Sequence, residues 1–133
     1  MAEEIRVPIN SDHDIVIARQ KGRALMVSLG FTSVDSTLVA TAISELARNI
    51  VTYAKHGEII VKSIDGHHRA GVLVIAQDDG PGIANIQLAM RDGFSTSGSL
   101  GMGLPGARRM MDEFEIISEP GRGTTVRTKK WAR

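Results

Sequence analysis

The most constraining feature of the sequence is an apolar stretch that stops abruptly at two acids and a Gly-Pro-Gly turn. Residues 71–77 read Gly-Val-Leu-Val-Ile-Ala-Gln, which predicts a buried strand. The strand must end near Asp78, because Asp79 is followed by the turn 80–82 and proline is excluded from the interior of a central strand. Asp78 is therefore expected at the mouth of a buried strand, as a hydrogen-bond acceptor on a rigid support. Taken alone, the same residues also suit a surface turn with two solvated acids.

Composition excludes several function classes. A chain of 133 residues is long enough for one core, so we expect a single domain over residues 1–133. The net charge of +1 and the aromatic content of 4% argue against a nucleic-acid partner. Without cysteine there is no disulfide framework or thiol chemistry. No apolar run has the length of a membrane span and the N-terminus is no signal peptide, so we expect a cytoplasmic protein without a membrane partner.

Periodicity along the chain predicts an α+β fold. The expected strands are 5–9, 58–64, 71–77, 114–118 and 124–130. The expected helices are one capped by Ser11 or Asp12 and ended by Gly30, one capped by Ser33 over 34–55, a short one at 85–91, and one over 104–113. Strands outnumber crossover helices and two hairpins are evident, so the sheet should be mostly antiparallel with helices on one face. That arrangement is a two-layer α/β sandwich.

Two polar residues of the long helix stand out. Glu45 and Asn49 are four residues apart and lie on one helical face. An asparagine oxygen is a hard, neutral ligand that suits Mg²⁺, and a glutamate one turn away can accept a proton from a nucleophile or orient it. The alternative is that both belong to the wet side of an amphipathic helix.

A glycine-rich segment precedes the last expected helix. Residues 98–106 formally contain G-x-G-x-x-G, but a polar loop stands before them where a dinucleotide fold needs a strand. They also lack the lysine and hydroxyl of a phosphate-binding P-loop. What remains is a set of free backbone N–H groups at a helix N-terminus, which favours an anion. A disordered surface loop is the alternative.

Four motifs in this order and spacing resemble the GHKL superfamily of ATPases and kinases, which includes gyrase, Hsp90, MutL and histidine kinases. The motifs are Glu45-Leu46-Ala47-Arg48-Asn49, Asp78-Asp79-Gly80-Pro81-Gly82, Gly101-Met102-Gly103-Leu104 and Gly123-Thr124-Thr125. The resemblance covers nearly the whole chain and implies the Bergerat ATP-binding fold. Within the superfamily, residues 93–98 and 111–114 are most similar to the RsbT-type switch serine/threonine kinases of bacterial stress signalling.

The resemblance implies a role for each motif. Asp78 would accept a hydrogen bond from the adenine amine, and Gly80 and Gly82 would let the backbone wrap the base. Asn49 would hold Mg²⁺, and Glu45 would be the general base or orienting group. The remaining expected ATP contacts are Ser95, Thr96, Gly101, Met102, Gly103, Leu104 and Thr125, with Thr125 supporting the adenine contact and Gly101 and Gly103 belonging to a lid.

The resemblance also implies an activity and partners. The expected function is that of a Mg-ATP-dependent protein serine/threonine kinase that works as a partner switch. Its substrates would be STAS-domain antagonists of the stressosome, similar to RsbS and RsbR, and the released kinase would activate a PP2C-type phosphatase. Autophosphorylation on histidine is not expected. Histidine kinases often carry a basic residue shortly after the asparagine that matches Asn49, whereas Thr52-Tyr53 follows here. The phospho-accepting dimerisation helices of histidine kinases are not expected either, because the chain begins at the first strand. The alternatives are a non-catalytic nucleotide-binding adaptor of anti-sigma type and a slow stand-alone ATPase.

Overall fold

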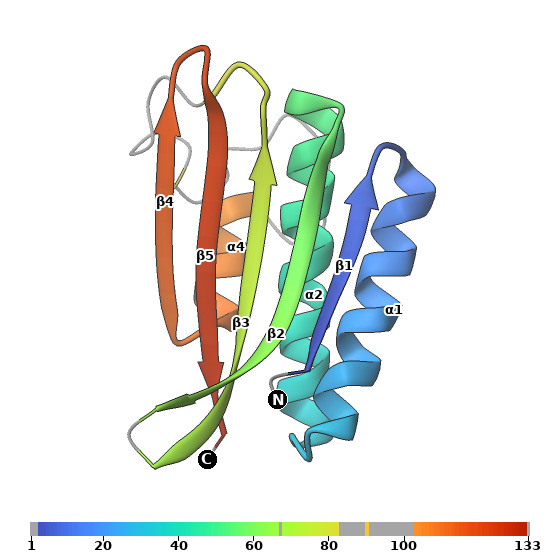
Figure 1. The fold of residues 1–133 in the computed structure, drawn as a ribbon, viewed down its shortest axis with the longest axis vertical. Coiled ribbons are helices and arrows are strands. Elements are labelled where there is room, and N and C mark those ends of the chain that lie inside the picture. The colour runs from blue at the N-terminus through green and yellow to red at the C-terminus, as the bar shows by residue number, and fades with distance from the viewer. Residues whose placement is uncertain (1–2, 67, 83–89, 91–102, 133) are drawn as a thin grey trace.

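Five strands form one sheet in the order β1-β2-β3-β5-β4 (Figure 1). The structure is a computed structural model that describes residues 3–66, 68–82, 90 and 103–132. The strands are β1 (Glu4–Ile9), β2 (Gly57–Gly66), β3 (Arg69–Asp78), β4 (Glu113–Glu119) and β5 (Gly123–Trp131). Each described strand pairs with its neighbours in antiparallel fashion. The last of them, β5, therefore lies inside the sheet between two strands that precede it in the chain.

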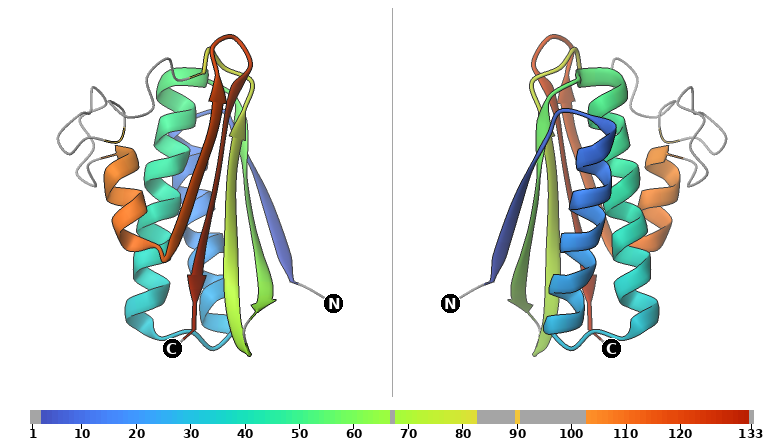
Figure 2. Two further views of the ribbon diagram at one scale, coloured as in Figure 1. Left: turned by 90° about the vertical axis from the view of Figure 1, so that its left-hand side faces the viewer. Right: turned by 90° about the vertical axis from the view of Figure 1, so that its right-hand side faces the viewer.

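All described helices cover one face of this sheet. They are α1 (Asp12–Ser28), α2 (Ser33–Asn49), the π-helical turn η1 (Ile50–Ala54) and α4 (Gly103–Met110). Figure 2 shows α1, α2 and α4 on the same side of the strands. The expected two-layer α/β sandwich of the α+β class is confirmed.

The core lies between the helices and the sheet. Successive residues of a strand point to opposite faces, and the inward residues of β3, Val72, Val74 and Ala76, are at most 4% exposed. They belong to one buried cluster with Ile43 and Leu46 of α2. A smaller apolar cluster lies on the helix-free face and comprises Ile60, Leu73 and Ile75. The alternation along β3 therefore assigns every paired residue of the sheet to one face or the other.

The long helix differs from expectation at both of its ends. Its N-cap is Thr32 instead of Ser33, because the Thr32 hydroxyl oxygen accepts the N–H of Asp35 at 3.1 Å. At Ile50 the α-helix changes into η1, closed by a hydrogen bond of 2.7 Å from the N–H of Lys55 to the carbonyl of Ile50. This wider turn takes the chain after residue 49 out of phase with α2.

Helix α4 is shorter than expected. It ends at Met110, and the N–H of Asp112 already donates to the carbonyl of Lys129 at 2.8 Å, which starts the pairing of β4 with β5. The expected helix at 85–91 lies outside the described residues, apart from Met90, and so do residues 98–102 of the glycine-rich segment. Within the described ranges, no helix is long and apolar enough to cross a membrane.

Candidate nucleotide-binding and catalytic site

Three elements meet at one end of the molecule. Figure 1 shows the end of β3, the β4–β5 turn and η1 together at this end. The N–H of Gly121 donates to the carbonyl of Pro81 at 2.7 Å, which joins the β4–β5 turn to the turn after β3. A Cβ added to Gly80 would lie 2.5 Å from the Cβ of Ala54, so η1 packs against the same turn. The turn at 78–82 is thus a packed junction, which removes the alternative of a free surface turn.

Asp78 is the last residue of β3 and is half-buried. Its Oδ1 accepts the N–H of Gly80 at 2.9 Å, and the backbone N–H of Thr124, the residue paired with Asp78, faces the same carboxylate and favours its charged form. Burial raises the pKa of Asp78 and the charge of Asp79 acts in the same direction, while the two backbone N–H groups oppose this. A carboxylate offers about four acceptor positions, so capacity remains for a ligand N–H. This geometry suits an acceptor that reads a donor group.

Glycine is required around Asp78 because neighbouring backbone occupies the place of a side chain. A Cβ on Gly82, whose φ is 79°, would overlap the carbonyl oxygen of Glu119. A Cβ on Gly123, whose φ is 87°, would overlap the carbonyl oxygen of Asp78. Both conformations are open to glycine at little steric cost. The turn after β3 and the start of β5 are consequently in direct backbone contact.

The register of β3 with β5 separates the two threonines at the start of β5. Thr124 pairs with Asp78, and Thr125 pairs with Gln77. Paired residues project to the same face, so Thr124 shares the helix-covered face with Asp78, while Thr125 lies on the helix-free face. The expected role of Thr125 beside Asp78 does not fit this register, and Thr124 occupies that position. The sequence alone could have predicted this, because Val126 is the apolar residue that points inward and Thr124, two residues before it in the strand, points to the same face.

Glu45 is buried one turn before the C-terminal end of α2, with only 4% of its surface exposed. Its Oε2 accepts the N–H of Gly103, the first residue of α4, at 3.1 Å. The positive end of a helix favours a carboxylate at this position. Leu104, the next residue, is 5% exposed and belongs to the core cluster. The alternative of a solvated helix side is therefore excluded for Glu45, which is fixed at the N-terminus of α4.

Asn49 is the last residue of α2, one turn beyond Glu45, and is partly buried. Its side chain makes no capping hydrogen bond. Among the described residues, no three His, Cys, Asp or Glu side chains are grouped so that they could hold a metal ion by themselves. Mg²⁺ typically takes one or two protein oxygens and completes its shell with substrate phosphates and water. A single neutral amide oxygen therefore fits a magnesium ion that a nucleotide shares.

The expected site residues fall into two contact groups. One contains Asp78, Gly80 and Gly82 with Thr124, and the other contains Glu45 and Gly103. The continuous segment α2–η1 joins the groups, because it carries Glu45 and Asn49 and reaches the turn after β3 through Ala54. Sequence reasoning did not find Ala54, whose part depends on a contact with a distant turn. Four further expected contacts lie outside the described residues: Ser95, Thr96, Gly101 and Met102.

Comparisons with known proteins identify the family of the chain. Residues 34–132 match the family described as histidine kinase-, DNA gyrase B-, and HSP90-like ATPase. The chain is 49% identical over 133 residues to the serine/threonine-protein kinase RsbT of Bacillus subtilis (strain 168), covering 100% of both chains. It is 33% identical over 120 residues to the anti-sigma F factor of Thermoanaerobacter sp. (strain X514), covering 86% of this chain and 82% of the relative.

A solved structure supports the fold. The RsbU and RsbW domains of Rv1364c from Mycobacterium tuberculosis match 100% of this chain with a TM-score of 0.62 and 20% sequence identity. The chain spans about a third of that structure, 33% of its length, and the likeness concerns the fold alone. The family model covers residues 34–132, which is most of the chain. The chain therefore belongs to the histidine kinase-, DNA gyrase B- and HSP90-like ATPase family, and within it to the RsbT-type serine/threonine kinases.

Proposed function

We propose that the protein is a Mg-ATP-dependent serine/threonine kinase that acts as a partner-switching regulator in bacterial stress signalling. The observation that carries the site assignment is the buried Glu45 carboxylate, which accepts the N–H of Gly103 and lies one turn from Asn49. A base, a magnesium ligand and a helix N-terminus are thereby near one another. The full-length similarity to a curated serine/threonine-protein kinase supports a protein hydroxyl as the acceptor.

The Asp78 end of the molecule is the proposed adenine site. The Asp78 carboxylate accepts the exocyclic amine of adenine and disfavours guanine, which presents an oxygen at the same place. Thr124 pairs with Asp78 on the helix-covered face, so we assign the supporting contact to its hydroxyl instead of that of Thr125. The hydroxyl is held in place by Ser118, whose Oγ lies 2.9 Å from Thr124 Oγ1. The backbone of Gly80 and Gly82 lines the edge of the base.

The Glu45 region is the proposed site of phosphate transfer. The Asn49 amide oxygen would hold Mg²⁺, and a bound magnesium ion neutralises the negative charge of the phosphates. Gly103 and Leu104 begin α4, whose N-terminus favours phosphate oxygens, and Ser95, Thr96, Gly101 and Met102 are assigned to a lid over them. The Glu45 carboxylate accepts the proton of the attacking serine or threonine hydroxyl, or orients that hydroxyl.

The proposed substrates are STAS-domain antagonist proteins similar to RsbS and RsbR. A phosphoryl group adds about −1.5 to −2 charge at neutral pH, which would break an interface that the hydroxyl form can make. The released kinase would then bind and activate a PP2C-type phosphatase. We place the protein in the cytoplasm, where ATP and such signalling partners are found.

A phosphotransfer assay with the STAS protein of the same bacterium tests this function. We expect the wild type to phosphorylate it, and Glu45→Ala and Asn49→Ala each to lower the rate by at least about 100-fold. Glu115→Ala is the matched control, because Glu115 is an exposed carboxylate on the helix-free face of β4. Unchanged phosphotransfer in both site variants would contradict the assignment of Glu45 and Asn49 to the site.

A non-catalytic nucleotide-binding adaptor of anti-sigma type is the second candidate. The similarity to anti-sigma F factors over 86% of the chain favours it. It predicts ATP binding and partner binding without a phosphorylated product. Mass spectrometry of the partner after incubation with Mg-ATP distinguishes the two, since only the kinase adds a phosphoryl group to it.

A further inference from the structure

Lys130 is a buried cation for which the proposed chemistry has no use. It lies in β5 opposite Val72, on the helix-covered face of the sheet, and only 4% of its surface is exposed. Burial of an ammonium group costs several kcal/mol unless the group is paired and hydrogen-bonded. The contacts that offset this cost therefore indicate what the residue does.

Those contacts are at the C-terminus of α4. The Lys130 Nζ donates to the carbonyl of Met110, the last residue of α4, at 3.0 Å, and lies 3.7 Å from Asp112 Oδ1. The last carbonyls of a helix lack partners within the helix, and a cation at this end also interacts favourably with the helix dipole. Asp112 is itself fixed, because its Oδ2 accepts the backbone N–H of Trp131 at 2.8 Å. Lys130 thus ties the end of α4 to β5.

The other end of the same helix holds Glu45. Helix α4 has eight residues, so its two ends are only about 12 Å apart. Pro105 in its first turn restricts the backbone further. At the N-terminus, Gly103 donates its N–H to Glu45. One short, rigid helix therefore connects the Lys130 ammonium to the Glu45 carboxylate.

We propose that Lys130 is a positioning residue for phosphate transfer. By holding the carbonyl of Met110, it fixes the position of α4 and hence of the Gly103 N–H that orients Glu45. This inference rests on the proposed function of Glu45. A misplacement of about 1 Å at a reacting group can cost about 100-fold in rate. The proposed adenine contacts lie on β3 and β5 around Asp78, away from α4, so loss of the Lys130 contact should lower the transfer rate more than the ATP affinity, which would lose only part of the proposed phosphate contacts of α4.

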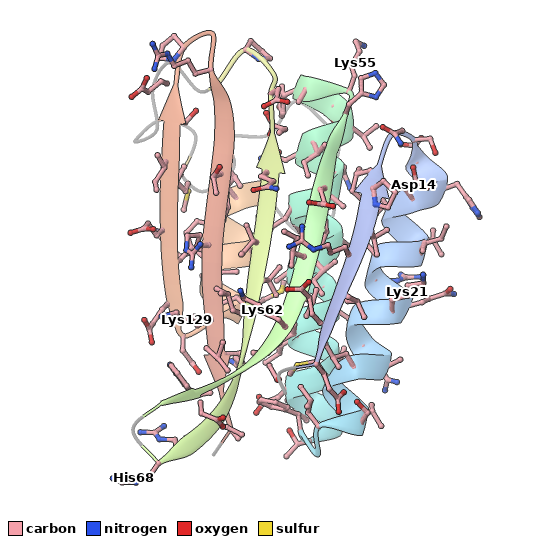
Figure 3. The ribbon with its side chains drawn as sticks, viewed as in Figure 1. Asp14, Lys21, Lys55, Lys62, His68 and Lys129 are labelled. Atoms are coloured by element: carbon pink, nitrogen blue, oxygen red, sulfur yellow. The ribbon has the colours of Figure 1, made fainter. Side chains whose placement is uncertain are left out.

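Kinetics of Lys130→Met test the proposal, because methionine keeps an apolar side chain of similar length and removes the donors. We expect kcat to fall at least about tenfold while the Kd for ATP changes less than about threefold. Lys130→Arg should restore most of the rate. Lys129→Met is the matched control: Lys129 projects from the helix-free face (Figure 3), 3.9 Å from Glu113, and its loss should leave kcat within about twofold.

Amide hydrogen exchange of the nucleotide-free protein separates positioning from general stability. Lys130→Met should speed exchange at Gly103 and leave Val74, in the centre of β3, unchanged. Unchanged exchange at Gly103, or a parallel rise at Val74, would overturn the proposal, as would an unchanged kcat. If the methionine variant does not fold, Lys130→Gln is measured in the same way. A wild type that transfers no phosphate contradicts the proposed function, while exchange at Gly103 still decides whether Lys130 positions α4.

Discussion

Glycine is required at both ends of the central strands, but it contacts backbone at one end and an aromatic side chain at the other. At the site end, Gly80 lets backbone pack against η1 beside the half-buried Asp78 carboxylate. At the far end, Gly66 and Gly71 lie beneath the Trp131 indole, where an added Cβ would come within 2.8 Å and 2.5 Å of the ring. One end keeps polar groups accessible at a rigid junction, and the other covers its glycines with an aromatic ring.

The two ends also differ in whether their polar groups are fully paired. The Trp131 Nε1 donates to Glu113 Oε2 at 2.6 Å, and its ring fills the space above the β2–β3 hairpin. At the site end, desolvation raises the pKa of Asp78, which means that the folded protein holds this charge at a cost. The comparison contrasts side-chain packing over glycines at the indole end with the proposed recognition of adenine at the carboxylate end, so substitutions at one end should affect stability or ATP affinity and spare the other property.

The largest stability effect is expected for Trp131→Ala. Loss of the partly exposed indole uncovers Gly66 and Gly71, and urea unfolding should show a loss of about 2 kcal/mol. Trp131→Phe removes only the hydrogen bond to Glu113 and some ring area, and should cost about 1 kcal/mol. Neither should change the Kd for ATP more than about twofold, since the site is at the other end of the sheet. A large fall in ATP affinity of the folded variant would break the division between the two ends.

Asp78→Asn should show the reverse behaviour. We expect ATP affinity, measured by calorimetry, to fall at least about tenfold, because an amide presents the adenine amine with a weaker acceptor. Stability at neutral pH should stay equal or rise, since the cost of a partly desolvated charge is removed. Full ATP affinity in the variant would contradict the adenine assignment.

The same carboxylate predicts a pH dependence of stability. The pKa of Asp78 is raised above the ordinary value of 3.8, so the folded state binds this proton more tightly than the unfolded state. Its contribution is fully present below the unfolded pKa and is lost as pH rises through the raised, folded pKa. Urea unfolding of the wild type across this window should show that loss, and Asp78→Asn should lack it.

Two glycines of the site end give a finer comparison. Gly80→Ala would place a Cβ 2.8 Å from the Cα of Ala54, so the turn must shift, and we expect ATP affinity to fall about fivefold. Gly121 has a φ of 80° but no atom within 4 Å of an added Cβ. Gly121→Ala should therefore cost about 1 kcal/mol of stability through backbone strain and leave ATP affinity unchanged. Equal losses of affinity would show that the turn responds to any disturbance.

The smallest effect is expected for Ser36→Ala, which belongs to neither end. Ser36 is fully buried in α2, and its hydroxyl has no hydrogen-bond partner among the described residues. Removal of an unsatisfied hydroxyl should leave the free energy of unfolding unchanged or raise it by up to about 0.5 kcal/mol. A loss above about 1 kcal/mol in urea unfolding would contradict this expectation.

The architecture was open to prediction because local patterns agreed with it. The β-branched run before Asp78 and the Gly-Pro-Gly turn located the central strand, and the helical spacing located α1 and α2. The N-cap was misassigned because Thr32 and Ser33 are adjacent hydroxyl residues with similar capping preference. The change to a π-turn at Ile50 was not predictable, because it depends on packing between η1 and a distant turn.

The site was predictable where spacing alone determines geometry. The four-residue interval between Glu45 and Asn49 places both on one helical face, as an α-helix requires. The contact of Glu45 with Gly103 joins residues 58 positions apart, which no local pattern encodes. The choice between Thr124 and Thr125 needed the alternation of buried and exposed residues in β5, which the motif Gly-Thr-Thr does not carry by itself.

The position of β5 has a consequence for biosynthesis. This strand is the last described element along the chain, yet it lies inside the sheet between β3 and β4. Until it is made and inserted, Thr124 cannot reach Asp78 and Lys130 cannot hold α4. Contacts between segments so distant in sequence form late and slowly. A nascent chain, or one cut before Gly123, would thus lack part of the proposed ATP site and should show no kinase activity.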